Sequence, residues 1–310
     1  MKKMVNRVVV QGRLYDHDLQ LKVTGTTSKS PNTEFITGSI HVATDDACLN
    51  VIPVHFTYVT ETTAKGGVNR TWNVLKSIID GSTVSVIGGG ADNAAYIDVS
   101  TALALNEWYD KDDKLVSAIR NEGGFVKTIN EADLLPENKR ATFATDMVIT
   151  SCTRVEANEE REIPEKVKVR GAIFNFRNEL MPVEFSMLDP KGMNYFEGLE
   201  ASSSNPVFTE VRGVEVSQTS VRKITEDSAF GDPSVREVRR SYKDYVLTWA
   251  KPEAYEWDSD ETILASELSE AMTHREVYLA DIKKRQDEYQ ASKNAPKPAV
   301  TAPAKGTYTF

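Results

Sequence analysis

Polar and hydrophobic residues alternate through residues 165–187, which predicts two β-strands joined by a short turn at 177–179. Successive strand residues point to opposite faces of a sheet, so one set can enter a core and the other cannot. The core-facing set is Val167, Val169, Gly171, Ile173, Met181, Val183, Phe185 and Met187. The outward set on the first strand is Lys166, Lys168, Arg170, Ala172, Phe174 and Phe176. The hairpin therefore predicts a basic and aromatic surface above an apolar underside.

The same hairpin pattern occurs earlier in the chain. The sequence TGSI at 37–40 parallels RGAI at 170–173, and IPVHF at 52–56 parallels MPVEF at 181–185. In the first copy the core-facing residues are Ile36, Gly38, Ile40, Val42, Ile52, Val54 and Phe56. The outward residues are Phe35, Thr37, Ser39, His41, His55 and Thr57. The inward and outward positions thus alternate in the same order in both hairpins, which indicates an internal duplication.

The pattern predicts the same order of elements around each hairpin. In the first half, a long strand at 5–24 precedes the hairpin strands at 34–43 and 49–60. A helix at 70–80 ended by Gly81, a short strand at 83–87, a glycine turn at 88–90 and a strand at 94–105 follow. In the second half, we expect strands at 146–155, 207–216 and 238–249, a short helix at 192–199 and a polar loop at 223–233.

Three further segments lie outside these repeats. Residues 106–136 predict an extension containing a hairpin, 115–119 with 125–129, around Glu122, Gly123 and Gly124; a connector over 134–143 follows. Residues 262–289 have apolar positions at helical spacing and predict a long C-terminal helix. The last segment, 291–310, is rich in Pro, Ala, Lys and Thr, which predicts disorder.

Composition narrows the class of protein. A chain of 310 residues with 40% hydrophobic and 27% charged residues is typical of a globular protein of about two domains. Its longest apolar runs are shorter than a membrane span, and we expect no signal peptide, because the start MKKMVNRVVVQGR has no apolar segment long enough. Cys48 and Cys152 lack metal spacing, so we expect a reducing cytoplasm, that of the host if the protein is viral. A net charge of −9 argues against a general duplex-DNA coat, but a local basic groove on an acidic body can still bind single strands.

Five strands with a helix between the third and fourth is the order of an OB-fold, whose second and third strands commonly bind oligonucleotides. The chain resembles tandem OB-fold single-stranded DNA-binding proteins, above all those of bacteriophages. The predicted fold is mostly β: a first barrel at 1–110, a hairpin extension and connector at 111–145, a second barrel at 146–252, a C-terminal helix at 253–290 and a disordered tail at 291–310. The resemblance implies binding of single-stranded DNA in phage DNA replication or recombination.

The resemblance also implies possible contacts with replication proteins through the C-terminal helix or tail. Bacterial proteins of this class typically end in an acidic tail with a terminal Phe. Here Phe310 is present, but the preceding residues AKGTYT contain no acid. The sequence therefore departs from the pattern at the segment that would contact partner proteins.

The outward strip Lys166, Lys168, Arg170, Phe174 and Phe176 is the first candidate site, because cations neutralise phosphates and aromatic rings stack with bases. The alternative is a solvated sheet face whose two Phe are covered by the C-terminal helix. Weaker candidates are Phe35, His41 and His55 in the first barrel, and Arg13 with Tyr15, which can equally be a surface pair. Arg236, Arg240 and Tyr242 lie on the predicted last strand, where charge can instead prevent edge-to-edge aggregation.

Catalytic and cofactor chemistry has no support in the sequence. The glycines at 88–90 lack the Lys-Ser or Lys-Thr of a phosphate-binding loop. His17, His41, His55 and His274 have no metal-ligand spacing. We therefore expect no cofactor, no metal and no enzyme activity. Two other hypotheses stay open. The protein could be a scaffold that binds other proteins, or it could bind single-stranded RNA, whose 2′-hydroxyl distinguishes it from DNA.

Overall fold

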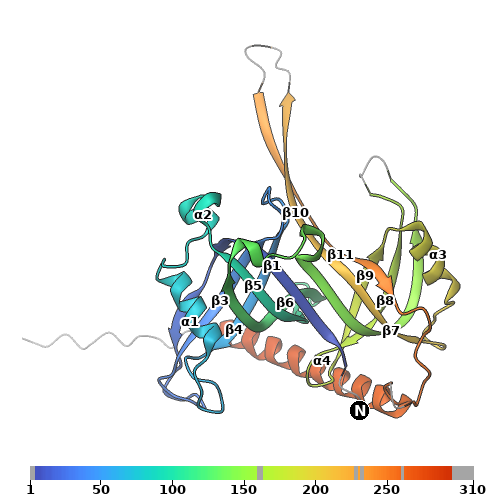
Figure 1. Ribbon diagram of the computed structural model, residues 1–310. Coiled ribbons are helices and arrows are strands. Elements are labelled where there is room, and N and C mark those ends of the chain that lie inside the picture. Colours follow the sequence, from blue (N-terminus) through green and yellow to red (C-terminus); the bar gives the residue numbers. More distant parts are fainter. Residues whose placement is uncertain (1–3, 159–162, 227–229, 231–233, 260–261, 295–310) are drawn as a thin grey trace, which may run out of the picture.

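The computed structural model describes residues 4–158, 163–226, 230, 234–259 and 262–294. Its described part is mostly β, with eleven strands hydrogen-bonded into one sheet and a long C-terminal helix. Within that sheet the pairings form two rings of strands, which lie side by side in Figure 1. We call these rings barrel 1 and barrel 2.

Barrel 1 contains β1 (Asn6–His17), β3 (Glu34–Ala43), β4 (Val51–Val59), β5 (Tyr96–Tyr109) and β6 (Leu115–Ile129). Its strands pair in the order β1–β3–β4–β6–β5 and back to β1. Helix α1 (Arg70–Ile79) lies between the third and fourth strands in the chain, and β2 (Gln20–Val23) adds to β3. Only the β4–β6 pairing is parallel, and it is short, so the barrel is partly open. This is an OB-fold-like order.

Barrel 2 repeats this plan with β7 (Ala141–Val155), β8 (Lys166–Phe174), β9 (Leu180–Met187), β10 (Val207–Glu226) and β11 (Ser234–Ala250). The order is β7–β8–β9–β11–β10 and back to β7, again with one short parallel pairing, β9–β11. Helix α3 (Pro190–Gly198) occupies the place of α1. The prediction of two OB-fold-like barrels in tandem is confirmed.

The first strands of the two barrels join them. β1 pairs antiparallel with β7, with Val8 opposite Phe143. The connector between the barrels carries only two short helical turns, Glu131–Asp133 and Glu137–Lys139. Because the β1–β7 ladder is continuous with both rings, the barrels share one sheet.

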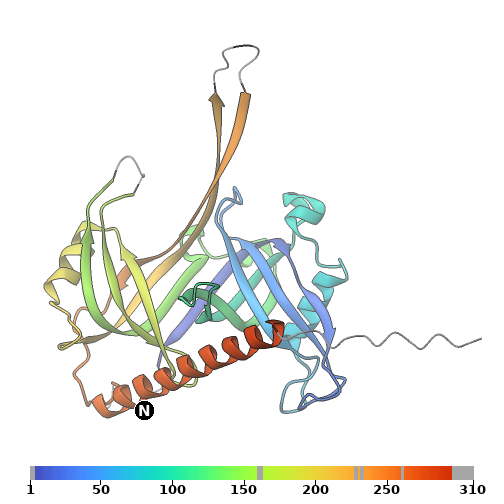
Figure 2. The ribbon, with the colours of Figure 1, turned by 180° about the vertical axis from the view of Figure 1, so that it is seen from behind.

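Helix α4 (Ala265–Asn294) runs along one side of both barrels (Figures 1 and 2). Its Arg275 makes a 2.6 Å ion pair with Glu107 of β5 and donates a hydrogen bond to the carbonyl oxygen of Leu180 in β9. One side chain thereby links the helix to both barrels. No helix in the described residues combines the length and apolar character needed to cross a bilayer.

The core contains the residues that alternation assigned to it. The core-facing side chains named above are buried in both copies of the hairpin, except the two glycines, and Val8, Val10 and Leu14 of β1 are buried with them. Gly38 and Gly171 approach neighbouring backbone so closely that a Cβ would meet Asp18 O at 2.7 Å and Val148 O at 2.0 Å. The predicted phase of both hairpins is therefore confirmed for the core face.

Three predicted elements of barrel 1 are wrong. The single long strand predicted at 5–24 is two strands, β1 and β2, separated at Asp18, whose backbone N–H and side chain both bond the backbone of Ser39. Residues 83–87 form no strand; Ser85 instead caps the short helix α2 (Val86–Gly89) by accepting a hydrogen bond from Gly88 N. The predicted hairpin at 115–129 is a single strand, β6, paired along β5. Gly123 and Gly124 have positive φ angles, which suit a turn, but here they form a bulge opposite Thr101. The barrel's fourth and fifth strands are thus β5 and β6.

In barrel 2 the hairpin between the fourth and fifth strands is longer than predicted. β10 and β11 remain paired as far as Glu226 opposite Ser234, so the expected loop at 223–233 is in part strand. This arm projects beyond the body of the protein (Figure 1). Helix α4 also continues to Asn294, past the predicted end at 290, and the rest of the predicted tail, 295–310, lies outside the described residues. The predicted domain boundaries stay predictions.

Candidate nucleic-acid interface

The basic strip predicted on β8 is held in ion pairs. Lys168 and Arg170 both contact Glu184 of β9, at 2.7 and 2.6 Å. Burial raises the pKa of Glu184, but hydrogen bonds from the two cations outweigh burial and hold the pKa below its ordinary value. Lys166 is mostly buried and contacts Asp244 of β11 at 3.0 Å. These three cations therefore meet carboxylates of the protein itself.

The prediction that Phe174 faces outward is wrong. Its side chain is fully buried in a small second core with Met4, Phe208, Ile263 and Ala271. Alternation assumes that one face of a strand meets solvent, but the segment around α4 covers the end of β8, so both faces are buried there. The covered-Phe alternative holds for Phe174. Phe176 differs, with 84% of its surface exposed.

In barrel 1 the predicted aromatic strip is only partly assembled. Phe35 is half-buried and packs on the exposed Tyr58, with ring centroids 4.8 Å apart. His55 lies within 3.2 Å of Ser39 Oγ, and burial, together with the charge of Arg120, lowers its pKa. His41 is half-buried on the same outward face. This face offers rings but no cation among the predicted residues.

The remaining predicted residues are scattered. Arg13 lies over the ring of Tyr96 at 5.0 Å, and Tyr15 is half-buried two residues further along β1. Tyr242 is exposed and donates a 2.7 Å hydrogen bond to Asp244. Arg236 and Arg240 lie on β11 in the projecting arm, where the structure describes the backbone and not these side chains. Tyr242 meets the β8 strip, because Lys166 donates a 3.0 Å hydrogen bond to the same oxygen of Asp244, whereas Arg13 and Tyr15 lie apart from that strip on β1.

A groove with a volume of about 2310 Å³ lies where the two barrels meet. Its floor is the outward face of β1 and β7, its walls come from β5 and β6 on one side and β10 and β11 on the other, and α4 lies at one end. Small-molecule pockets usually measure about 300–1,000 Å³. The groove therefore has room for a segment of a polymer.

Two rows of directly opposed residues cross this groove. The first row runs Arg7, Ala144, Arg212 and Trp249, across β1, β7, β10 and β11. The second runs Phe125, Ser100, Val9, Thr142 and Val214, across β6, β5, β1, β7 and β10. The floor positions Val9, Thr142 and Ala144 carry small side chains, and the large rings of Trp249 and Phe125 stand on opposite walls. They are 37% and 79% exposed.

Each of these rings lies beside a bulge with a glycine. A Cβ on Gly124 would meet Ser100 O at 2.1 Å, and one on Gly213 would meet Val246 O at 2.3 Å. The register shifts at the same places, between Ser100 and Ala102 and between Arg212 and Gly213. Bulges bend a strand and re-aim its side chains. The two glycines therefore shape the walls that carry the rings.

Phe176 is displayed at the α4 end of the groove by a tight turn. Asn175 Oδ1 accepts hydrogen bonds from the backbone N–H groups of Arg177 and Glu179, at 2.9 and 3.0 Å. Asn178 takes a φ of 60°, which Asn tolerates better than most residues. The guanidinium of Arg177 lies 5.1 Å from the centre of the Phe176 ring. The turn thus holds an exposed ring with a cation beside it.

The charges of the groove favour a polyanion. Three acidic side chains that line it are paired with arginines of the protein: Glu107 with Arg275, Glu122 with Arg120 and Glu210 with Arg212. A fourth, Glu179, accepts a hydrogen bond from the neutral amide of Asn175 and keeps its negative charge. Arg7, Lys139 and Arg177 also line it and form no ion pair with any described residue. The groove therefore carries an excess of uncompensated positive charge.

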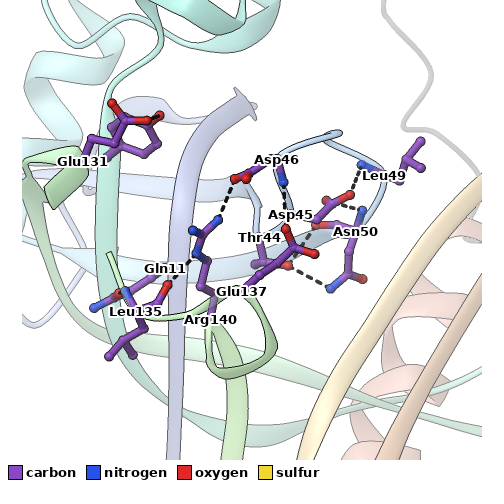
Figure 3. A network of polar contacts seen from close by, with 11 residues as sticks. Gln11, Thr44, Asp45, Asp46, Leu49, Asn50, Glu131, Leu135, Glu137 and Arg140 are labelled. Atoms are coloured by element: carbon purple, nitrogen blue, oxygen red, sulfur yellow. Dashed lines mark hydrogen bonds and ion pairs between the residues drawn. The ribbon is translucent and has the colours of Figure 1, made fainter. Parts of the chain in front are cut away.

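The connector closes the end of the groove opposite α4. Leu135 N donates to Gln11 Oε1 at 2.9 Å, and Arg140 Nε donates to Leu135 O at 2.8 Å (Figure 3). Arg140 also makes a 2.8 Å ion pair with Asp46. These contacts fix the connector on β1 and join it to the loop between β3 and β4.

That loop in turn reaches barrel 2. Asp45 accepts hydrogen bonds from the backbone N–H groups of Leu49 and Asn50, which orders the loop (Figure 3). Asn50 Oδ1 accepts from Ser217 N at 2.6 Å, where β10 begins its arm. Asn50 also forms a bridge with Gln218. The base of the arm is thus tied to barrel 1.

Of the predicted site residues, only Phe176 lines the groove; Arg7, Phe125, Arg212 and Trp249 were missed. Phe125 was placed in a separate hairpin, and Trp249 was read only as the end of a strand. The available signal was alternation in β1, which puts Arg7 on the same outward face as Val9 and Arg13. Within the described residues, no three His, Cys, Asp or Glu side chains are placed to hold a metal ion.

The fold defines the class of protein: two OB-fold-like barrels joined through their first strands. A family model described as YorF matches residues 4–285, and the chain belongs to the YorF family. The sequence matches none of the curated proteins with which it was compared. Among solved structures, one similar chain is a deletion mutant of the single-stranded DNA binding protein from Thermus aquaticus, at 11% identity and a TM-score of 0.49, covering 84% of this chain and 100% of that one. A likeness this distant carries no information on function.

Proposed function

We propose that this protein binds single-stranded DNA, without strong sequence preference, in the groove between its barrels. The observation that supports this most is the combination, in one open groove, of three exposed rings and cations that form no ion pair within the part of the chain that the structure describes. Phe176, Trp249 and Phe125 follow one another along it, from the α4 end toward the connector. Stacking on such rings and neutralisation of the backbone are how sequence-tolerant binders hold single strands.

The rings of the groove suit unpaired bases better than a duplex. Bases in a duplex are stacked on one another, so their faces are not available to Phe or Trp side chains. A single strand can turn its bases onto the rings while its phosphates meet Arg7, Arg177 and Lys139. The finer role that we propose, in replication or recombination of phage DNA, rests on the sequence resemblance alone.

The β8 strip has a lesser place in this proposal. Lys168 and Arg170 keep exposed surface beside Glu184, so a bound strand that passes over barrel 2 can compete for them. Phe35, His41 and His55 stay candidates for contacts on barrel 1, as do Arg13 and Tyr15 on β1. None of these residues supplies both an exposed ring and an unpaired cation within the groove.

The test is equilibrium binding of a labelled, unstructured DNA oligonucleotide over a series of salt concentrations. We expect tight binding to the single strand, weak binding to its duplex, and a log–log salt slope of about −0.7 for each phosphate contact. Replacing Arg7, Lys139 and Arg177 with Ser should flatten that slope by about two units. A matched control replaces Lys22, Lys65 and Lys191, which do not line the groove, and should leave the slope unchanged.

Equal affinity for single strand and duplex would contradict the proposal. A ribose oligonucleotide of the same sequence, used as competitor, addresses the RNA alternative. If ribose competes better than deoxyribose, the protein is an RNA binder. If neither binds, the scaffold alternative is favoured.

A further inference from the structure

The groove is built on a local two-fold axis. Val8 of β1 lies opposite Phe143 of β7, and on their other sides these residues lie opposite Thr101 of β5 and Gly213 of β10. A rotation by half a turn about an axis between Val8 and Phe143 therefore places each barrel on the other, and Thr101 on Gly213. The bulges after Leu14 in β1 and Ile149 in β7 lie equally far along the chain from that axis. The two barrels are thus related as the halves of a dimer would be.

The axis makes the two rows across the groove equivalent. It exchanges Ser100 with Arg212, and therefore Phe125, opposite Ser100, with Trp249, opposite Arg212. Both walls carry an aromatic ring at the same position of the barrel. The backbone of the two rows and the rings of Trp249 and Phe125 consequently look alike from either end.

The charges do not follow this symmetry. The Trp249 row contains two cations, Arg7 and Arg212, whose backbones lie two strands apart, about 10 Å. Their equivalents in the Phe125 row are Thr142 and Ser100, which are neutral. Arg212 is held in place by Glu210 at 2.8 Å and lies 4.2 Å from the centre of the Trp249 ring. The Trp249 row therefore carries a net positive charge from Arg7 and a second guanidinium whose charge Glu210 balances, whereas the Phe125 row carries no charge.

The two ends of the groove also break the two-fold symmetry. At the α4 end, the turn between the second and third strands of barrel 2 presents Phe176 and Arg177. The equivalent turn of barrel 1, near the connector, instead carries Asp45 and Asp46, and Arg140 binds Asp46. A strand that enters from the α4 end thus meets Phe176 and Arg177 first, whereas one that enters from the connector end meets Lys139.

We propose that the groove holds a single DNA strand in one fixed direction, and that Arg7 and Arg212 set this direction. The inference rests on the proposed function. A DNA strand has different 5′ and 3′ ends, so a groove with true two-fold symmetry would hold it equally well both ways round. Only residues that break the symmetry can distinguish the two directions, and these two arginines break it in the middle of the groove, Arg7 on the floor and Arg212 on one wall.

The experiment uses a short oligonucleotide with a photoreactive base at either its 5′ or its 3′ end, bound to the intact protein at saturation. After irradiation, the crosslinked peptides are identified by mass spectrometry. We expect one end to crosslink to the peptide around Phe176 and the other to the peptide around Lys139, each with at least a tenfold preference. Equal crosslinking of both ends to both peptides would overturn the inference.

A second variant tests the two arginines by giving each the residue of its own counterpart. In the double variant Arg7→Thr/Arg212→Ser both rows are neutral, and we expect both ends to crosslink to both peptides. The variant Ser100→Arg/Thr142→Arg gives the Phe125 row the arginines of the Trp249 row and should likewise lose the preference. Retention of one direction in both double variants would contradict the role of the arginines. Absence of binding by the unaltered protein would instead contradict the proposed function.

Discussion

The two barrels repeat one strand order, but the hairpin between the fourth and fifth strands differs between them. In barrel 1 this hairpin, β5–β6, turns at 110–114 and lies along α4, with Glu107 bound to Arg275 and Lys283 bound to Asp113. In barrel 2 the hairpin β10–β11 extends as an arm (Figure 1). The shared alternation defines the barrels, whereas the parts of the strands beyond them can diverge.

A second contrast lies at equivalent positions of the repeated hairpin. Phe174 in barrel 2 corresponds to His41 in barrel 1, since both follow the matched Ile residues. Phe174 is fully buried beneath the α4 segment, and His41 is half-exposed. Among the described residues, the C-terminal segment covers this face in barrel 2 and leaves it half-exposed in barrel 1. The duplication therefore preserves the core face, while the outer face depends on what packs against it.

The largest expected effect concerns this pair. We expect Phe174→Ala to lower the free energy of unfolding by about 4 kcal/mol, because it removes a buried ring from a packed core. His41→Ala, its counterpart, should change the free energy by no more than about 1 kcal/mol. Urea unfolding measures both. Equal losses would show that α4 does not distinguish the two copies.

The next effect concerns a buried acid with an apolar counterpart. Glu215 of β10 is buried where the barrels meet and accepts a 2.7 Å hydrogen bond from Asn121; its equivalent in β5 is the buried Leu103. Burial raises the pKa of Glu215 to about 7, although Asn121 and the charge of Lys243 oppose the rise. The folded protein thus keeps this proton up to about pH 7, whereas the unfolded chain releases it near pH 4.5.

Stability should accordingly fall as the pH rises from about 4.5 to 7, by on the order of 3 kcal/mol from this group. In Glu215→Gln the amide stays neutral at every pH, so this part of the pH dependence should disappear. Unfolding by urea at a series of pH values gives the comparison. An unchanged pH profile in the variant would contradict the assignment to Glu215.

A smaller effect tests how α4 is attached. Arg275→Ala should destabilise the protein by about 2 kcal/mol, because it leaves Glu107 buried without its cation. Arg170→Ala removes an ion pair of similar length that is far more exposed and should cost less than about 1 kcal/mol. If the two variants lose equal stability, Arg275 does not link the helix to the barrels in the way described.

Alternation predicted the fold well because it reports which face of a strand enters a core. Val167, Val169 and Ile173 were placed correctly on this basis, as were their counterparts in barrel 1. The same rule failed at Phe174, because burial of the second face depends on the distant C-terminal segment. At 83–87 it failed because Ser85 and the following glycines favour a capped helical turn over a strand.

Local sequence patterns do not predict the groove. The residues missed from sequence, Arg7, Phe125, Arg212 and Trp249, come from β1, β6, β10 and β11. The β1–β7 pairing is what brings them together. Gly123 and Gly124 have the same sequence signature in a turn and in a bulge, so Phe125 could not be assigned to a barrel wall. The pairing of Lys168 and Arg170 with Glu184 was foreseeable in principle, since Glu184 faces outward on the adjoining strand.

The central claim is that the rings of the groove, and not those of the outer barrel faces, hold single-stranded DNA. Its most direct test is the affinity of Phe125→Ala/Phe176→Ala/Trp249→Ala for an unstructured oligonucleotide, compared with Phe35→Ala/Tyr58→Ala. Because each stacked base contributes about 1–3 kcal/mol, we predict at least a hundredfold loss for the groove variant and less than a threefold loss for the other. Equal affinity of the groove variant and the unaltered protein, with both folded, would contradict the account.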